Sequence, residues 1–299
     1  MIIDLKNKSS NEILECFENI DIKSGEIVEA ELLESEVKNF GYKAFVDLAQ
    51  LYFMRFLTPV KKDETTKILR FQKLHLESSF HNSDDNGSEK YGVQSDFFAI
   101  DKTAQFSFLY YYKKALEFVN VKGKKRVLNL GVNRGDEFDV IKKMLTDEEF
   151  SSIEFVGIDY SASAIEYAKK EFSQYKNIEF ICHDINRLEE LNLEKFDLII
   201  SIGTLQSSNI EFNATFMSIY QNYLAEGGAM VLGFPNCRWI DGEMVYGAKA
   251  PNYSFSELSL VLKDIHFCKK YLQQKKYRAV VTGKDYLFLS ARKIAHVKI

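Results

Sequence analysis

The pattern of apolar and polar positions changes near residue 124. Beyond it, short apolar runs rich in β-branched and aromatic residues predict strands, at 125–130, 153–159, 177–182, 196–202 and 227–234. Stretches with helical periodicity separate them, at 137–145, 161–172, 213–224 and 256–272. Strands that alternate with helices imply right-handed crossovers and a mostly parallel sheet covered on both faces. Two last apolar runs, at 277–283 and 285–292, predict a terminal antiparallel hairpin.

The chain before residue 124 predicts helices instead. Ser9 and Glu12 have capping-box spacing, which starts a helix over 11–17. The segment 44–57 is apolar on all sides and predicts a buried helix, and residues 65–76 predict another. A polar stretch at 81–92 predicts a loop, and residues 101–119 predict a helix that leads into the second part. We therefore expect an α/β protein with a helical N-terminal region or lid (1–120) and a sheet domain (121–299).

Composition narrows the functional classes. The 299 residues are 46% hydrophobic and 27% charged, with a net charge of -4, which fits a globular protein and argues against a generally basic nucleic-acid binder. The first fifty residues are acidic, whereas the tail from Lys263 is basic. The four cysteines form no CxxC pair, so we expect neither a disulfide framework nor a metal site. No apolar run is long enough to span a bilayer, and we expect a cytoplasmic protein.

The turn after the first strand of the second part carries alternate special residues. Gly131, Asn133 and Gly135 follow that strand. A dinucleotide fingerprint needs glycines at the second and third of its places, where Asn133 and Asp136 stand, so an NAD-dependent dehydrogenase is a distant alternative. The alternate spacing, with residues 124–292 around it, resembles Rossmann-like (class I) S-adenosylmethionine-dependent methyltransferases. These usually carry an acid two positions before the first glycine, where this chain has Asn129.

The resemblance implies a mostly parallel seven-stranded Rossmann-like sheet and a cofactor site at its strand ends. The acid that ends the second strand, Asp159, would accept hydrogen bonds from the ribose hydroxyls. Asp184, after the third strand, would meet the adenine amino group, and the N–H of Ile185 would meet the ring. The end of the fourth strand would line the methyl-donor pocket. The expected cofactor-binding residues are Asn129, Gly131, Asn133, Gly135, Asp159, Tyr160, Asp184, Ile185, Ser201 and Gly203.

Each of these residues also has a structural interpretation. A glycine there can serve a tight turn only, Asp159 can cap the helix over 161–172, and Asp184 can cap the helix that follows it. If the cofactor lies against the turn, a Cβ at the glycines would collide with it. Asparagine reaches the left-handed conformation more readily than most residues, which suits position 133. Asn129 lacks the usual charge but can still accept a hydrogen bond through its amide oxygen.

The acceptor is less clearly marked than the cofactor. A long loop, 233–253, follows the fifth strand, and its candidate acceptor-site residues are Asn236, Arg238, Trp239 and Tyr246. Arg238 could anchor an anionic acceptor, or Trp239 and Tyr246 could simply pack the loop onto the sheet. A segment at 89–102 is suited to closing the cofactor site. No histidine stands out as a general base, so the catalytic residues are left open.

These patterns favour a methyltransferase that uses S-adenosyl-L-methionine and modifies an oxygen or nitrogen of a small-molecule substrate. Two alternatives stay open. One is an RNA-modifying enzyme whose basic tail contacts phosphates. The other is a non-catalytic module that binds partners through its N-terminal region. The sequence specifies neither the acceptor nor the oligomeric state.

Overall fold

The computed structural model describes residues 1–78, 91–248 and 256–294. The chain forms two compact units. The N-terminal unit contains Met1–Asn82 and Trp239–Tyr246, and the larger unit contains Ser83–Arg238 and Gly247–Ile299.

The larger unit is built on one seven-stranded sheet in the order β12-β13-β9-β8-β5-β6-β7. Strand β13 runs opposite to the other strands of this sheet, since it pairs antiparallel with both β12 and β9. This confirms the predicted fold class, a mostly parallel Rossmann-like sheet with a terminal hairpin. The strands are β5 (Arg126–Leu130), β6 (Glu154–Asp159), β7 (Ile178–Cys182), β8 (Phe196–Ile202), β9 (Leu224–Pro235), β12 (Tyr277–Gly283) and β13 (Tyr286–Lys293).

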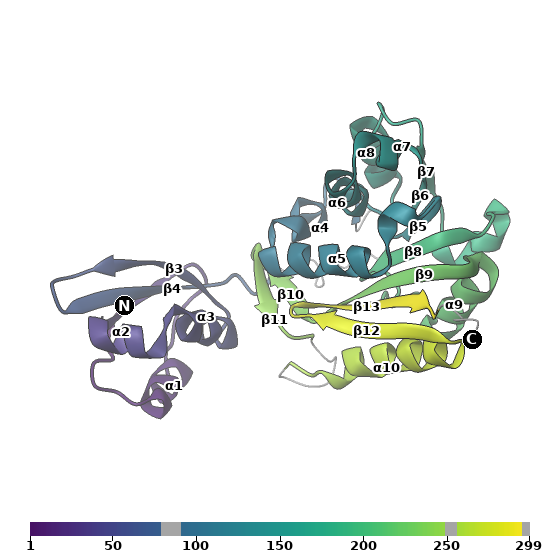
Figure 1. Ribbon diagram of the computed structural model, residues 1–299. Helices are drawn as coiled ribbons and strands as arrows, with labels where there is room; N and C mark the ends of the chain where they lie inside the picture. Colours follow the sequence, from purple (N-terminus) through teal and green to yellow (C-terminus); the bar gives the residue numbers. More distant parts are fainter. Residues whose placement is uncertain (79–90, 249–255, 295–299) are drawn as a thin grey trace. The chain divides into compact units, whose positions relative to one another are not determined.

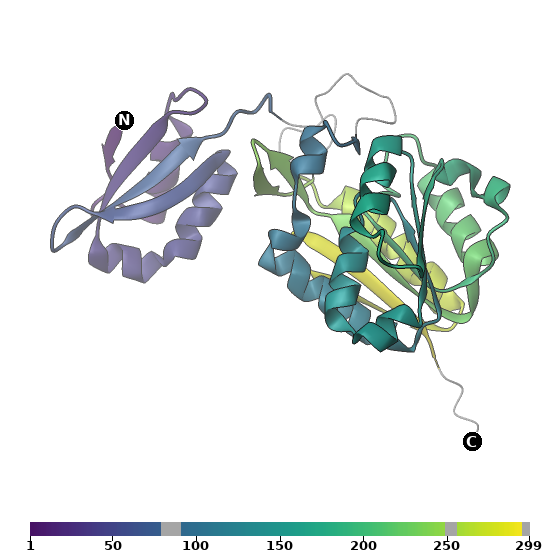
Figure 2. The same cartoon turned by 90° about the horizontal axis from the view of Figure 1, so that it is seen from above.

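Helices cover both faces of this sheet. In Figure 1, α5 and α6 lie on one face and α9 and α10 on the other, and Figure 2 gives the view from above. A large apolar cluster joins the inner side chains of η5, α9 and α10 to the central strands. The helices are α4 (Asp96–Ala99), η3 (Lys102–Ala104), α5 (Phe106–Phe118), η4 (Val121–Gly123), α6 (Asp136–Met144), α7 (Asp147–Ser151), α8 (Ala162–Glu171), η5 (Ile185–Leu191), α9 (Phe212–Ser218), η6 (Ile219–Tyr223) and α10 (Ser259–Gln274).

The N-terminal unit is not a helical region, which corrects the expectation for residues 1–120. It has a four-stranded sheet in the order β1-β2-β4-β3, with three helices on one face (Figure 1). The capping box at Ser9 and Glu12 is present and starts α1. The elements are β1 (Ile2–Asp4), α1 (Ser10–Glu18), β2 (Ile27–Leu33), α2 (Glu34–Phe40), α3 (Tyr42–Leu51), β3 (Met54–Lys61) and β4 (Thr66–Lys73).

Two helix predictions in this unit were wrong. The apolar segment 44–57 is helical only as far as Leu51, because Phe53 adopts a left-handed φ of 54° and turns the chain into β3. Residues 66–73 form β4, whose Leu69 and Phe71 pair with β2 and are completely buried. Strand pairing decided both outcomes, and that information is absent from local periodicity.

The boundary also differs from the predicted one at residue 120. Helix α5 belongs to the larger unit, where Phe108 packs edge-on against Tyr286 and Phe288 of β13. Conversely, most of a short hairpin from the loop after β9 belongs to the N-terminal unit. Its strands are β10 (Cys237–Ile240) and β11 (Glu243–Tyr246).

The hairpin is attached to the N-terminal unit by polar and apolar contacts. Arg55 donates from Nε to Glu243 at 3.0 Å and from Nη2 to the carbonyl of Asp241 at 2.6 Å. Ile240 and Val245 pack into a small apolar cluster with Leu74. These residues therefore complete the N-terminal unit although they lie far from it in the sequence. Among the described residues, no helix is long and apolar enough to cross a membrane.

Candidate active site

The turn between β5 and α6 has three left-handed residues in alternate positions. Gly131, Asn133 and Gly135 have φ values of 76°, 45° and 91°. Asn133 thus takes the conformation for which asparagine is tolerated. The turn is tied to the next strand, because the N–H groups of Gly131 and Val132 both donate to the carbonyl of Ile158.

The space over the two glycines is filled by the chain itself. A Cβ on Gly131 would lie 1.8 Å from Oγ1 of Thr204, and one on Gly135 would lie 2.6 Å from the ring of Phe172. Within the chain itself, Thr204 and Phe172 are therefore the side chains that a Cβ at Gly131 or Gly135 would meet.

Asp159 ends β6 beside this turn and is 8% exposed. Its Oδ2 accepts from the N–H of Asn133 at 2.8 Å, and its Oδ1 accepts from the N–H of Ser161 at 3.0 Å. Burial raises the pKa of Asp159 although these N–H groups oppose the shift. The N-cap of α8 is Ser161, so Asp159 is not needed for that role. The N–H of Tyr160 also hydrogen-bonds to this carboxylate, so three of its four lone-pair sites are used and one is left for a ligand.

Asp184 follows β7 and acts as a helix cap, which is the structural interpretation of this residue. Its side chain accepts from the N–H of Asn186 at 2.9 Å and caps η5, whose first residue, Ile185, is buried. Tyr160, between Asp159 and Ser161, is 52% exposed. At the end of β8, Ser201 is buried and Gly203 has a left-handed φ of 77°.

Residues 91–100, which we call the strap, lie against the glycine turn. The carbonyl of Tyr91 accepts from Nδ2 of Asn133 at 2.8 Å, and Arg134 donates to the carbonyls of Phe98 and Ile100 at 3.1 and 3.3 Å. Tyr91 hydrogen-bonds with Ser207 in the loop after β8, and burial raises its pKa. The strap thus joins the ends of β5 and β8. This agrees with the placement expected for 89–102, of which residues 89 and 90 lie outside the described residues.

Beneath the turn lies a buried polar cluster that the sequence motif does not include. Asn129, on β5, is completely buried and donates from Nδ2 to Oε2 of Glu137 at 3.2 Å. Glu137, in the first turn of α6, is 1% exposed and pairs through Oε1 with Nζ of Lys102 at 2.6 Å. Their only sequence signals are that Glu137 lies eight residues after Asn129 and that Lys102 lies in the segment predicted to close the site.

A methyltransferase-domain family model matches residues 122–281, more than half of the chain. The chain belongs to this family. It is therefore a methyltransferase-family protein. No curated protein sequence matches it significantly.

Several solved structures are similar to this methyltransferase. The N-methyltransferase NodS from Bradyrhizobium japonicum WM9, in complex with S-adenosyl-L-homocysteine, is 17% identical, with 70% of this chain and 97% of that chain covered and a TM-score of 0.47. The magnesium protoporphyrin IX methyltransferase from Synechocystis PCC 6803, with bound cofactor, is 16% identical, with 67% and 86% covered and a TM-score of 0.42. TehB from Haemophilus influenzae is 13% identical, with 79% and 72% covered and a TM-score of 0.40.

The larger unit of the methyltransferase offers groups that fit the cofactor. Asn129 Oδ1 and Ser201 Oγ are buried and have no hydrogen-bond partner within the described residues. They lie on the neighbouring strands β5 and β8, where the strand order reverses and open α/β sheets bind ligands. Because buried polar atoms are normally hydrogen-bonded, the two atoms are candidates for contacts with a ligand.

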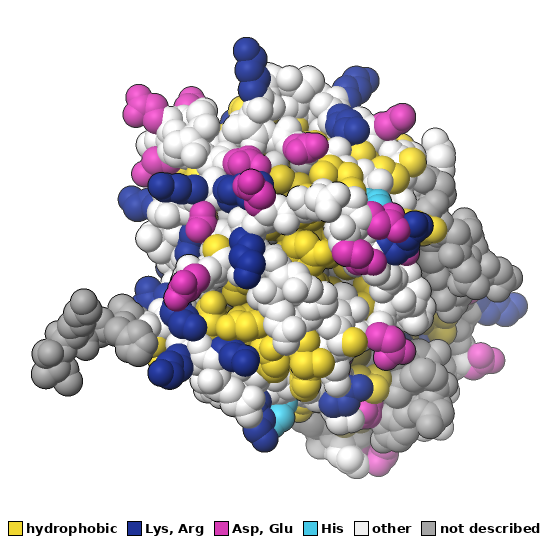
Figure 3. All heavy atoms as spheres, turned by 90° about the vertical axis from the view of Figure 1, so that its right-hand side faces the viewer, with side chains coloured by type: hydrophobic (Ala, Val, Ile, Leu, Met, Phe, Trp, Pro, Cys, Tyr) yellow, Lys and Arg dark blue, Asp and Glu magenta, His cyan; other side chains and the backbone are white. Residues whose placement is uncertain are grey.

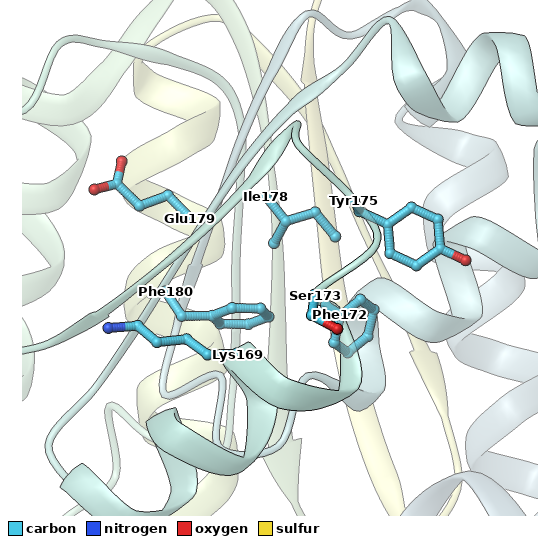
Figure 4. A pocket seen from close by; sticks show the side chains of 7 residues that line it. All are labelled: Lys169, Phe172, Ser173, Tyr175, Ile178, Glu179 and Phe180. Carbon is cyan, nitrogen blue, oxygen red and sulfur yellow. The ribbon is translucent and has the colours of Figure 1, made fainter.

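The described cavities lie elsewhere. The one in Figure 4, of about 340 Å³, is at the end of α8 and the start of β7, away from the carboxyl ends of the strands. It is lined by Lys169, Phe172, Ser173, Tyr175, Ile178, Glu179 and Phe180. At the ends of β5 and β8, Tyr91 is half-buried and hydrogen-bonds with Ser207, and Thr204 lies over Gly131.

The four acceptor-site candidates are divided between the units. Asn236 and Arg238 belong to the larger unit, whereas Trp239 and Tyr246 belong to the N-terminal unit. Asn236 is 4% exposed and its Oδ1 has no partner in the described part of the chain. Burial lowers the pKa of Arg238. Trp239 is buried and Tyr246 is exposed, and residues 249–253 of the predicted loop lie outside the described residues.

Proposed function

We propose that the cofactor lies at the carboxyl ends of β5, β6 and β8, and that the enzyme methylates an oxygen or nitrogen of a small molecule. The observation that supports this most is the convergence of a left-handed turn, the buried carboxylate of Asp159 and the unpartnered Oδ1 of Asn129 at one edge of the sheet. Bound there, S-adenosylmethionine supplies an activated methyl group for in-line displacement.

The residues of the chain then have to position the reactants and exclude water. Asp159 accepts from a hydroxyl group through its remaining lone pair, while the N–H groups of Asn133 and Ser161 keep its carboxylate in place. Asn129 accepts from an ammonium group. Because methyl transfer from a sulfonium does not require a base in every case, the lack of an obvious one is compatible with the reaction.

A small acceptor is favoured by the strap. Residues 91–100 cover the glycine turn and hydrogen-bond to both β5-side and β8-side loops. A crevice closed in this way by the chain itself admits a small molecule more easily than a folded polymer. We propose that the strap acts as the lid that keeps water away from the methyl group.

The test begins with calorimetric titration of the full chain with S-adenosylmethionine and S-adenosylhomocysteine. Asp159→Asn should weaken binding by about 1.5–3 kcal/mol for each charge-assisted hydrogen bond lost, which is at least about tenfold. Asp197→Asn is the matched control, because Asp197 accepts from the backbone N–H groups of Lys125 and Arg126 at the opposite ends of the strands. Equal affinities for both variants and the parent would remove Asp159 from the site.

An RNA acceptor is the second candidate, because Arg278 and Arg292 flank the ring of Phe118 at 5.9 and 5.0 Å. However, Arg292 pairs with Ala229, which in turn pairs with Leu198 near the start of β8, so this basic group lies at the edge opposite the proposed cofactor site. On the face in Figure 3, Lys and Arg side chains lie among Asp and Glu side chains. Salt-dependent binding of RNA that Arg292→Glu abolishes would favour this candidate.

A measurement of turnover distinguishes an enzyme from a non-catalytic module. A labelled methyl donor incubated with small-molecule fractions should yield a labelled product. Cofactor binding without product from any fraction would direct attention to partners of the N-terminal unit.

A further inference from the structure

The amide of Asn129 is held in one orientation. Its Nδ2 donates to Glu137, and its Oδ1 has no donor within reach among the described residues. The residue is fully buried on β5, with Gly157 and Ile200 as its neighbours in register. An unpartnered acceptor in such a place is unfavourable unless a ligand satisfies it.

The orientation follows from the charge of Glu137. Lys102 lies 2.6 Å from its other oxygen. Burial would lower the pKa of Lys102, but the carboxylates of Glu137 and Asp136 outweigh burial and raise it. In its ion pair with Lys102, Glu137 takes part as a carboxylate, and a carboxylate only accepts hydrogen bonds. Asn129 must therefore turn its NH₂ group toward Glu137 and its oxygen away from it.

We propose that Glu137 is a positioning residue: together with Lys102, it fixes the Asn129 amide so that Oδ1 accepts a hydrogen bond from the α-ammonium group of the cofactor. This rests on the proposed cofactor site. An acid at position 129 would bring two carboxylates to about the 3.2 Å that now separates Asn129 Nδ2 from Glu137 Oε2, and one of them would have to bind a proton. The pair Asn129 and Glu137 avoids that conflict.

We expect each single variant to weaken cofactor binding and the double variant to restore it. In Glu137→Gln, Lys102 takes the amide oxygen and the new NH₂ group faces Asn129, which turns its oxygen away from the cofactor. In Asn129→Asp the two carboxylates compete. In the double variant Asn129→Asp/Glu137→Gln, the Asp accepts from the Gln with one oxygen and offers the other to the cofactor, so binding returns.

The experiment titrates these variants with two probes, S-adenosylhomocysteine and 5′-methylthioadenosine, of which the second lacks the amino-acid group. Glu137→Gln and Asn129→Asp should each weaken S-adenosylhomocysteine binding at least about tenfold, the worth of one charge-assisted hydrogen bond, and methylthioadenosine binding less than about twofold. The double variant should recover to within about threefold of the parent. Glu154→Gln, which removes a carboxylate bound to Arg126 at the starts of the strands, should change neither affinity.

The outcomes separate the two proposals. A parent protein that binds neither probe refutes the cofactor site itself. A parent that binds both, with a Glu137→Gln variant that binds S-adenosylhomocysteine equally well or loses both probes alike, refutes the positioning role. Thermal unfolding of each variant reports its fold. If Glu137→Gln does not fold, Asn129→Ala serves instead, and unchanged selectivity for S-adenosylhomocysteine in that variant overturns the proposal.

Discussion

A Gly131→Ala substitution, which adds a single methyl group, tests directly why the turn between β5 and α6 requires a glycine. Alanine at this position faces two separate costs. The left-handed φ of 76° costs roughly 1–2 kcal/mol for a residue with a Cβ, and this cost is partly offset because alanine restricts the unfolded chain. The second cost is the contact with Thr204, since the new Cβ would lie 1.8 Å from Oγ1 and 2.7 Å from Cβ of that residue.

Gly227 isolates the first cost. It has the same φ of 76°, it lies in the same unit, and no atom lies within 4 Å of the position that a Cβ would take there. Gly227→Ala therefore carries the backbone cost alone. Gly131→Ala adds the cost of overpacking, about 1–3 kcal/mol. We expect the free energy of unfolding to fall by that much more for Gly131→Ala than for Gly227→Ala.

The measurement is urea unfolding followed by far-ultraviolet circular dichroism, without cofactor. Tryptophan fluorescence is the internal control, because Trp239 is the only tryptophan and belongs to the N-terminal unit. A Thr204→Gly change should remove most of the difference, giving a coupling energy of about 1–3 kcal/mol in the double-mutant cycle. Equal destabilisation of Gly131→Ala and Gly227→Ala would refute the claim that Thr204 is what requires a glycine here.

Further expectations concern affinity, pH, thiols and the hairpin. Tyr91→Ala should raise both the association and the dissociation rate of S-adenosylhomocysteine in stopped-flow experiments, because the strap then loses its hydrogen bond to Ser207; unchanged rates would exclude gating by Tyr91. Burial raises the pKa of Asp159 in the folded state, so the folded protein binds more protons than the unfolded one between about pH 4 and that pKa, and stability falls as pH rises through this window. Asp159→Asn should lack that slope in urea titrations at several pH values. Burial raises the pKa of Cys237 to about 12, so in native protein at about pH 8 a thiol reagent should modify the exposed Cys182 and spare Cys237; modification of both at equal rates would contradict the buried position. Arg55→Ala should lower the stability reported by tryptophan fluorescence by about 1 kcal/mol, since the hairpin contacts are part-buried, and should leave the circular dichroism transition of the larger unit in place.

The larger unit could be predicted closely from the sequence because its strands are short, apolar and separated by helices with clear periodicity. The predicted strand at 196–202 coincides with β8, and the predicted run at 125–130 differs from β5 by one residue. The N-terminal unit could not be predicted in the same way. Its β2 alternates buried and half-buried residues, yet what fixes β3 and β4 as strands is their pairing with β2 and with each other.

In the candidate site, too, features set by neighbouring residues could be predicted, whereas features set by contacts between distant residues could not. The left-handed turn, with Asn133 at its centre, follows from spacing and residue type. Glu137 could not be recognised, because its importance comes from a hydrogen bond across the turn and an ion pair with Lys102, 35 residues away in the sequence. Local patterns likewise could not show that Trp239, an acceptor-site candidate, belongs to the N-terminal unit.

The hairpin of β10 and β11 also has a consequence for how the protein is made. Met1–Asn82 belong to the N-terminal unit, the chain then passes into the larger unit, and Trp239–Tyr246 belong to the N-terminal unit again. On the ribosome, the N-terminal unit therefore cannot be completed until most of the larger unit has been synthesised, although domains usually fold in order of emergence. A fragment ending at residue 82 would leave Leu74 without Ile240 and Val245. Cleavage between residues 82 and 83 would give two pieces that stay associated, because the hairpin belongs to the second piece and packs within the N-terminal unit.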